Sequence, residues 1–312
     1  MIKSVPEAAD MDAVESQPLM TEVHPRRGPG SVLALGTAHW GQPYGVGPRR
    51  GQADADTLAG LLEAARTHGI DCLDTARAYG SAEAVIGSLV RPGMHIVTKL
   101  PPGIQAEGIR PAIRQSCQAL GRTHLDAILL HRASDASPET ARILRTLRAE
   151  GHVKRTGVSV YDVGEVAACR RAGLPIDLVQ IPASLVDQRL LRSGLLDRWV
   201  AEGVEVHCRS LFLQGLLLLD ADSRPAHIPD PTGILPRFDA WRGHHARLAR
   251  ALSIVALMPG VTRWVLGVRD PGELEAIIRT LSDPPPPPSP VELDALDAGS
   301  SLLVRPDLWP AP

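Results

Sequence analysis

Aromatic residues, paired cysteines and net charge are all scarce in this sequence. Aromatic side chains make up 3% of the 312 residues, which leaves little material for stacking platforms. The formal net charge of −2 predicts no electrostatic attraction to nucleic acid or to anionic membranes. The four cysteines are scattered without a Cys-x-x-Cys pair, so we expect the reduced thiols of a cytoplasmic protein and neither a disulfide framework nor a zinc site.

Long apolar runs are missing as well. No run approaches the roughly 20 residues that a membrane-spanning helix needs, and the N-terminus lacks the apolar core of a signal peptide. The adjacent pair His244 and His245 has no carboxylate at ligand spacing, which predicts a solvated helix face and no metal site. We therefore expect a cytoplasmic protein with no membrane partner and no metal.

The sequence is long enough and apolar enough to form a folded core. With 44% apolar residues, the chain can bury a large core, as one barrel or as two smaller domains. Residues 1–30 mix acidic residues, proline and glycine without periodicity and are expected to form a flexible tail. We expect residues 31–282 to form one catalytic domain and residues 283–312 a Pro-rich spacer, a short helix and a tail.

Strand-like and helix-like segments alternate from Ser31 onward. Apolar runs predict strands at 31–36, 71–74, 95–99, 127–131, 153–160, 178–181, 205–210 and 264–268. Amphipathic spacing predicts helices, among them 53–68, 81–90, 106–120, 138–150 and 271–281. Eight strand–helix units in roughly 250 residues predict an α/β fold, a single-domain (β/α)8 TIM barrel. A doubly wound open sheet is the alternative, but no Gly-x-Gly-x-x-Gly follows the first strand.

Two irregular segments interrupt this alternation. The stretch 220–240 is too long and too rich in proline for a simple connection, and because it follows the seventh strand we expect a lid or substrate loop on the catalytic face. The stretch 283–290 is nearly all proline, which predicts a stiff polyproline spacer ahead of a short helix at 291–296. A partner that recognises polyproline is the alternative interpretation of this stretch.

Four residues with catalytic chemistry stand at or just beyond the ends of predicted strands. Asp74, Lys99 and His131 each close an apolar run, and Tyr79 follows in the loop after Asp74. In a parallel barrel the C-terminal strand ends build the active site, so these side chains are expected to converge. The structural alternatives are a core histidine at 131 and a rim ion pair between Asp74 and Lys99.

The four side chains together suit proton transfer to a carbonyl oxygen. Tyrosine alone is a poor acid at neutral pH, because its pKa lies near 10. An ammonium group at Lys99, held by Asp74, is expected to lower that pKa, and His131 is expected to hydrogen-bond a substrate oxygen. None of these groups supplies a hydride, so a reduction at this site requires a cofactor.

The segments around these positions resemble the aldo-keto reductase family. The resemblance is carried by Asp-Thr-Ala-Arg-Ala-Tyr-Gly-Ser-Ala-Glu at 74–83 and by the segments 35–45, 98–100, 130–131 and 156–159, and it covers about Val32 to Thr280. It implies that Tyr79 is the general acid and that Lys99 lowers its pKa. It further implies that Asp74 anchors Lys99 and that His131 orients the carbonyl.

The same resemblance implies that NADPH binds in an extended pose across the barrel mouth, without a Gly-rich phosphate loop. The nicotinamide amide would contact Ser159 and Gln180, and the segment 210–214 would wrap the diphosphate. Arg269 could pair with the 2′-phosphate, which favours NADP(H) over NAD(H). The full set of expected cofactor contacts is Thr37, Ser159, Gln180, Arg209, Ser210, Leu211, Gln214, Gly267, Arg269 and Glu273.

The chain departs from the family pattern at three of these places. Val160 stands where many members have an asparagine, so one amide contact is lost, and Ile277 stands where an asparagine often contacts the adenine, so a looser adenosine site is expected. Arg209 replaces a tyrosine that stacks on the nicotinamide in many members. A guanidinium repels the cationic, oxidised ring, so we hypothesise that Arg209 weakens binding of the oxidised cofactor and favours reduction.

The substrate is constrained only loosely. Trp40 is expected to form an apolar wall, and Arg77 and Arg132 are either salt-bridged rim residues or ligands for an anionic or polyhydroxylated substrate. With so few aromatic residues, a small polar carbonyl compound is favoured over a steroid-like one.

The leading interpretation is an NADPH-dependent reductase of an aldehyde, ketone or imine. A cofactor-retaining epimerase that works through a transient ketone, and an NADPH-binding sensor or scaffold subunit, are the alternatives. The expected partner is a small-molecule carbonyl substrate, and the sequence leaves open whether the protein is a monomer or a homo-oligomer.

Overall fold

The computed structural model describes residues 28–46, 52–90, 93–243 and 245–310. Most of the tail expected at 1–30, and His244 of the histidine pair, lie outside these residues. Among the described helices, none combines the length and the apolar character needed to cross a membrane.

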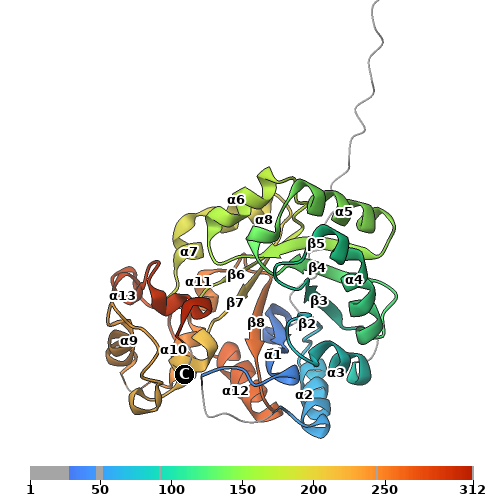
Figure 1. Ribbon diagram of the computed structural model, residues 1–312. Coiled ribbons are helices and arrows are strands. Elements are labelled where there is room, and N and C mark those ends of the chain that lie inside the picture. The colour runs from blue at the N-terminus through green and yellow to red at the C-terminus, as the bar shows by residue number, and fades with distance from the viewer. Residues whose placement is uncertain (1–27, 47–51, 91–92, 244, 311–312) are drawn as a thin grey trace, which may run out of the picture.

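Eight parallel strands in the described part of the chain close into a barrel, with each strand paired to its neighbours in sequence order and β1 paired to β8 (Figure 1). They are β1 (Leu33–Gly36), β2 (Cys72–Asp74), β3 (His95–Lys99), β4 (Leu125–Leu130), β5 (Val153–Ser159), β6 (Leu178–Pro182), β7 (Glu205–Arg209) and β8 (Arg263–Gly267). Every predicted strand is present, with ends shifted by up to two residues. The TIM barrel predicted from the alternation is confirmed, and a closed sheet excludes the doubly wound alternative.

Helices surround the strands on the outside, as Figure 1 shows. They are α1 (Ala38–Gly41), α2 (Ala55–Thr67), α3 (Ala82–Leu89), α4 (Ala106–Leu120), α5 (Pro138–Ala149), α6 (Val163–Arg171), α7 (Arg189–Ser193), α8 (Leu195–Ala201), α9 (Ile234–Arg242), α10 (Arg247–Leu252), α11 (Ile254–Leu257), α12 (Pro271–Ser282) and α13 (Pro290–Leu296). Short 3-10 turns lie at Pro29–Val32, Ala133–Asp135, Leu213–Leu218, Ala221–Ser223, Leu302–Val304 and Pro306–Leu308.

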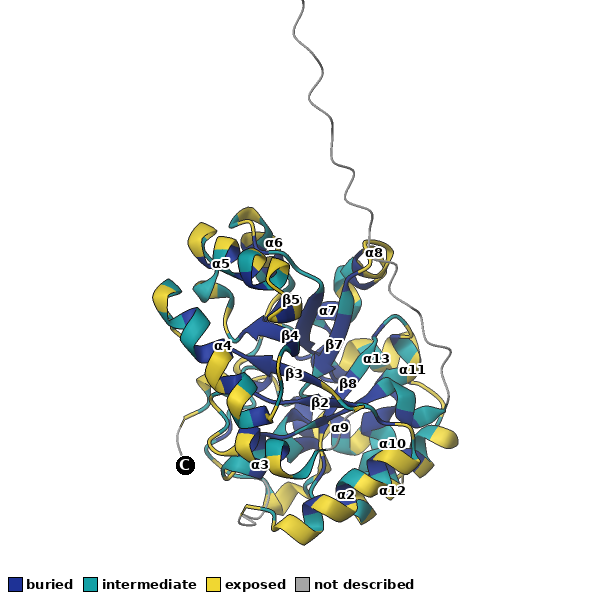
Figure 2. Ribbon diagram, turned by 90° about the vertical axis from the view of Figure 1, so that its right-hand side faces the viewer, coloured by how far each residue is buried: buried dark blue, intermediate teal, exposed yellow. Residues whose placement is uncertain are grey.

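Buried side chains form two layers because alternate strand residues face opposite sides of the sheet. A small inner cluster fills the barrel and consists of Ala34, Cys72, Val97, Ala127, Leu129, Leu178 and Val265. A much larger cluster, which includes Leu33 and Leu35 of β1, packs between the strands and the helices. Figure 2 shows the strands buried and the outer helix faces exposed. The filled interior leaves the C-terminal strand ends as the place for a site.

The stretch 220–240 is less irregular than its proline content predicts, because its last part begins helix α9. The carboxylate of Asp230 accepts hydrogen bonds from the backbone N–H groups of Ile234 and Leu235, and Pro236 stands in the first turn, where a proline costs the helix no hydrogen bond. Arg224 pairs with Asp239 of the same helix at 2.7 Å. The segment is therefore tied down by its own ion pair.

The chain after the Pro-rich stretch returns to the catalytic side of the barrel. Residues 283–289 form neither helix nor strand, and α13 then pairs with α7 through Arg192 and Asp294 at 2.7 Å. Farther on, Arg189 donates a hydrogen bond to the carbonyl oxygen of Val304 at 3.4 Å. The C-terminal segment thus lies against the connection that follows β6.

Candidate active site

The C-terminal ends of the strands carry most of the predicted site residues. Asp74, Lys99 and Ser159 are the last residues of β2, β3 and β5, and His131 directly follows β4. Arg209 is the last residue of β7. The closed barrel therefore places these side chains on one face.

Lys99 and Asp74 form a buried ion pair at the centre of this face. The Lys99 ammonium lies 2.7 and 2.8 Å from the two carboxylate oxygens of Asp74 and donates a further hydrogen bond to the carbonyl oxygen of Thr75 at 2.9 Å. Burial lowers the pKa of Lys99, and the charge of Asp74 opposes this shift. Two buried charges are tolerated here because each neutralises the other.

Tyr79 is positioned by a close approach of two loops. Its backbone N–H donates to the carbonyl oxygen of Ala76 at 3.0 Å. Gly41 at the end of α1 packs against the same turn, since a Cβ added there would lie 1.9 Å from the carbonyl oxygen of Tyr79. The Tyr79 ring has its centroid 5.3 Å from Nζ of Lys99 and meets the His131 ring edge to face, with 5.9 Å between the ring centroids. Tyr79, Lys99 and His131 therefore form one contact group.

The electrostatics of Tyr79 differ from the simplest expectation. Burial raises the pKa of its phenol, and the nearby charge of Asp74 raises it further, while the charge of Arg209 lowers it. The ammonium of Lys99, which is expected to lower this pKa, does not outweigh burial and the charge of Asp74. Tyr79 is accordingly protonated at neutral pH and holds a proton to donate.

His131 is a neutral imidazole in this environment. Burial, followed by the charge of Lys99, lowers its pKa to about 4. Its Nδ1 is buried and has no hydrogen-bond partner among the described residues. A neutral imidazole can donate or accept a hydrogen bond at a ligand oxygen.

The residues expected to hold the nicotinamide amide are hydrogen-bonded, directly or through each other, to Asp74 of the Lys99–Asp74 pair. The side-chain N–H of Gln180 donates to the carboxylate of Asp74 at 2.6 Å. The Ser159 hydroxyl donates to the side-chain oxygen of Gln180 at 3.4 Å. The Thr37 hydroxyl donates to the carbonyl oxygen of Asp74 at 3.0 Å. These three side chains are buried and lie around the base of the site.

Arg209 packs against an aromatic ring that the sequence pattern does not indicate. Its guanidinium lies 4.3 Å from the centroid of the Tyr161 ring and donates to the carbonyl oxygen of Val160 at 3.1 Å. Arg305 from the C-terminal segment lies 4.7 Å from the same ring centroid. Tyr161 and Arg305 are thus neighbours of the predicted site that the sequence pattern does not indicate. Tyr161 is one of only three tyrosines in the chain, which was a reason to examine it. Nothing in the sequence places Arg305 beside it.

The loop after β7 has a strained backbone. Ser210, Leu213 and Gln214 are the only non-glycine residues of the described chain with positive φ. Such backbone strain concentrates at ligand sites. The Val46 N–H donates to the carbonyl oxygen of Gln214 at 3.1 Å, and a Cβ added at Gly45 would lie 3.6 Å from a guanidinium nitrogen of Arg269. Loops after β1, β7 and β8 thus meet at the guanidinium of Arg269, and a cation beside a strained backbone fits the phosphate groups of a dinucleotide cofactor.

The predicted adenosine end lies at the start of α12. Glu273 accepts a hydrogen bond from the backbone N–H of Arg269 at 2.9 Å, and Gly267 is the last residue of β8. The Arg269 guanidinium has no carboxylate within ion-pair distance in the described chain. Ile277 is 4% exposed and belongs to the core, so it presents no surface to a ligand. Leu211 is likewise buried, which leaves its backbone for any cofactor contact.

The three predicted substrate residues lie in different environments. Trp40 is fully buried in the core and offers no wall to a ligand in this structure. Arg77 pairs with the buried carboxylate of Glu83 at 2.9 Å and also donates to Gln115 at 3.1 Å, which corresponds to the salt-bridged alternative. Arg132 is exposed beside His131.

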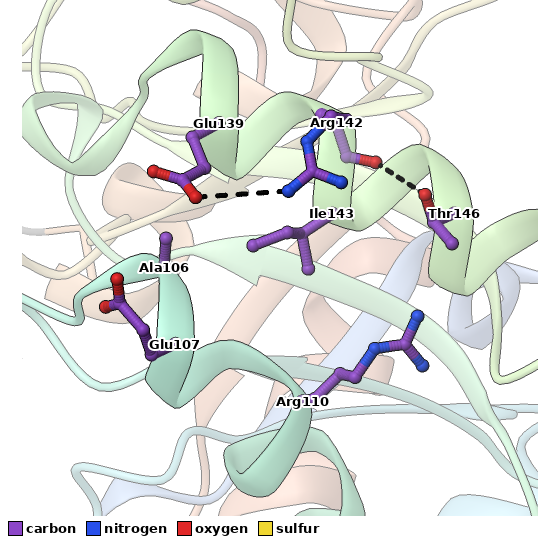
Figure 3. A pocket seen from close by; sticks show the side chains of 7 residues that line it. All are labelled: Ala106, Glu107, Arg110, Glu139, Arg142, Ile143 and Thr146. Carbon is purple, nitrogen blue, oxygen red and sulfur yellow. Dashed lines mark hydrogen bonds and ion pairs between the residues drawn. The ribbon is translucent and has the colours of Figure 1, made fainter.

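A hollow on the outside of the barrel lies apart from this chemistry. It has a volume of about 290 Å³ between α4 and α5, and its lining includes Arg110, Glu139 and Arg142 (Figure 3). Glu139 and Arg142 pair across one turn at 3.9 Å. The catalytic groups at the strand ends are not part of its lining. The described residues contain no group of three side chains suited to hold a metal ion.

Comparison with known proteins agrees with this arrangement. The chain matches the model of the Aldo/keto reductase family over residues 32–289. It is 28% identical over 151 residues to the D-arabinose 1-dehydrogenase of Saccharomyces cerevisiae, covering 43% of this chain and 44% of that protein. It is 32% identical over 137 residues to the 6-dehydroglucose reductase of Agrobacterium fabrum, covering 35% of this chain and 46% of that protein. The chain thus matches less than half the length of these two relatives.

Solved structures share the fold at low sequence identity. The aldo-keto reductase AKR11C1 of Bacillus halodurans superposes with a TM-score of 0.68 at 18% identity and covers 85% of this chain and 90% of its own. The glycerol dehydrogenase AKR11B4 of Gluconobacter oxydans gives 0.64 at 22% identity, with 90% and 93% covered. The family uses nicotinamide cofactors, and its members are oxidoreductases that act on carbonyl and alcohol groups. Since the family model spans most of the sequence, this chain belongs to the aldo/keto reductase family.

Proposed function

We propose that this protein is an NADPH-dependent reductase of a small, polar aldehyde, ketone or imine, with Tyr79 as the general acid. The observation that carries the proposal is the buried Lys99–Asp74 pair beside the ring of Tyr79, which in turn meets the ring of His131. An amine, a phenol and a neutral imidazole in one contact group suit protonation of a carbonyl oxygen. The catalytic domain is residues 31–282, and residues 283–312 form its extension.

Each residue has a defined role in this proposal. A reduced nicotinamide, when bound, would supply the hydride that the carbonyl carbon needs. His131, neutral at physiological pH, orients the substrate by a hydrogen bond to its oxygen. Tyr79 transfers its phenolic proton to that oxygen as negative charge develops on it, and the Lys99 ammonium, fixed by Asp74, stabilises the phenolate left behind. Burial of the Lys99–Asp74 pair strengthens these interactions by excluding water.

The preference for NADPH over NADH rests on Arg269. Its guanidinium stands where three loops meet and has no carboxylate partner among the described residues, and a guanidinium matches phosphate oxygens in geometry and charge. Replacement of Arg269 by Met is expected to weaken NADPH binding while leaving NADH binding unchanged. Equal weakening for both cofactors would contradict the assignment.

A polyhydroxylated carbonyl compound is the substrate class that we favour. Its support is the composition, which is poor in aromatic residues, and the names of the two relatives above, both of which refer to sugar compounds. The four cysteines are free thiols, which fits the reducing cytoplasm.

A screen of aldehydes, ketones and aldoses, followed by the absorbance of NADPH, tests the function. The proposal predicts stoichiometric oxidation of NADPH with at least one small polar carbonyl compound. Conversion of a sugar without net NADPH consumption would indicate the epimerase alternative. Tight NADPH binding with no turnover across the screen would indicate the sensor alternative.

A further inference from the structure

Arg209 lies on the inward side of the barrel mouth. Residues paired in register on parallel strands point to the same side of the sheet, and His207 is paired with Gln180, whose side chain reaches Asp74 inside the barrel. Arg209 is two residues beyond His207, so it faces the same way one layer closer to the mouth. Arg209 is thus one inward-facing layer closer to the mouth than Gln180, which binds Asp74.

The charge of Arg209 has no carboxylate partner in the described part of the chain. Its guanidinium donates to the carbonyl oxygen of Val160 at 3.1 Å and to the Ser210 hydroxyl at 3.2 Å, both of them neutral acceptors. Lys99 differs, because both oxygens of Asp74 bind its ammonium group. Arg209 therefore supplies a positive charge that no neighbouring carboxylate neutralises at contact distance.

Tyr161 keeps this guanidinium in place. A guanidinium is attracted to the face of an aromatic ring, and the contact of 4.3 Å between Arg209 and Tyr161 fixes a side chain that is otherwise flexible. Arg305 packs on the same ring, but its charge is taken up by Asp307 at 2.8 Å. The C-terminal segment thus adds packing to this stack without adding net charge.

We propose that Arg209 is a positioning residue for proton transfer: its charge stabilises the phenolate that forms when Tyr79 gives its proton to the substrate oxygen, and Tyr161 holds it in place for that task. The inference rests on the proposed function. In the step, the O–H bond of Tyr79 breaks, an O–H bond forms on the product alcohol, and the negative charge moves to the phenolic oxygen. The electrostatic effect of Arg209 on Tyr79 has the direction that this role requires. Burial raises the pKa of Tyr79, and the charge of Arg209 lowers it.

Replacement of Arg209 by Met, with Arg209→Lys as the charge-conserving variant, tests the proposal. At saturating NADPH, with glyceraldehyde or the best compound of the screen, we expect kcat to fall about tenfold or more in Arg209→Met, the solvent deuterium isotope effect on kcat to rise, and KM to change little. Arg209→Lys is expected to recover most of kcat. Arg198→Met, which removes an exposed arginine paired with Glu202 on the surface, is the matched control and is expected to keep the parent rate.

The stack itself is tested by Tyr161→Leu and Arg305→Met. Loss of the ring is expected to lower kcat and raise the isotope effect in the same direction as Arg209→Met, whereas loss of the already paired Arg305 has a smaller effect. An unchanged kcat and isotope effect in both Arg209→Met and Tyr161→Leu would overturn the proposal. A loss confined to KM would also overturn it, because it would assign Arg209 to substrate binding. Absence of carbonyl reduction by the parent protein would instead refute the proposed function.

Discussion

The ammonium of Lys99 lies 2.7 Å from one carboxylate oxygen of Asp74 and 2.8 Å from the other, and the side chains are 1% and 5% exposed. Each charge has been taken out of water and is tolerated only because the other is present. Gln180 adds a hydrogen bond to Asp74 at 2.6 Å, which leaves the carboxylate well satisfied. The pair therefore has a structural role that is separable from its proposed role in catalysis.

Removal of one partner is expected to cost stability, and removal of both is expected to restore it. Lys99→Met leaves the buried Asp74 unpaired, so the free energy of unfolding should fall by roughly 3–5 kcal/mol. The double variant Lys99→Met/Asp74→Asn should recover most of this loss while turnover stays low. Chemical denaturation of the three proteins checks this. Additive losses in the double variant would show that the two charges do not depend on each other.

The pH dependence of stability should report on His131. Its pKa is about 4 in the folded protein against 6.5 when unperturbed, so the unfolded state binds more protons and stability falls as the pH is lowered through this window. The contribution lost between pH 7 and pH 5 is about 2 kcal/mol. His39 has the same lowered pKa and titrates in the same range, so the difference between parent and His131→Asn isolates the effect. Parallel stability–pH curves for these two proteins would contradict the lowered pKa of His131.

Gly41 should be intolerant of a side chain because of Tyr79. An added Cβ would lie 1.9 Å from the Tyr79 carbonyl oxygen and 2.3 Å from the Ala82 nitrogen, so Gly41→Ala must move the Tyr79 turn. We expect a stability loss above about 1 kcal/mol and a drop in turnover. Gly60→Ala is the matched control, since that exposed glycine of α2 has its nearest neighbour at 3.4 Å and should gain about 0.5–1 kcal/mol. Thermal unfolding and turnover of both variants decide this, and a fully active Gly41→Ala would disprove the role of the close approach.

Arg209 should bias the site against the oxidised cofactor. Its unneutralised charge repels a cationic nicotinamide ring and leaves the neutral, reduced ring unaffected, so Arg209→Tyr should tighten NADP+ binding relative to NADPH. Fluorescence titration with each cofactor measures the ratio of the two dissociation constants without any need for turnover. The hypothesis fails if this ratio is the same in parent and variant.

The barrel could be predicted from the sequence because each strand and helix is marked by the pattern of apolar residues within its own segment. Apolar runs of strand length and amphipathic helices repeat along the chain, and α4 was predicted at its observed bounds of Ala106–Leu120. Parallel closure then brings the strand ends together without further information, which is why the positions of Asp74, Lys99 and His131 could be anticipated.

Contacts between distant segments could not be predicted in this way. Arg305 reaches Tyr161 from a tail more than a hundred residues away, and nothing in either local sequence encodes that approach. Trp40 was expected on a pocket wall, but its large apolar surface is buried in the core instead. The carboxylate of Asp230 accepts hydrogen bonds from the first turn of α9, which begins within a stretch whose prolines predict an irregular loop.

The central claim is that Tyr79 donates the proton in a carbonyl reduction, and Tyr79→Phe tests it most directly. This change removes one oxygen atom and keeps the ring that packs against His131, so the fold and the NADPH site should persist. We predict that the variant still binds NADPH with parental affinity, measured by quenching of tryptophan fluorescence, but that turnover falls by about 100-fold or more. Near-parental turnover in Tyr79→Phe would contradict the account.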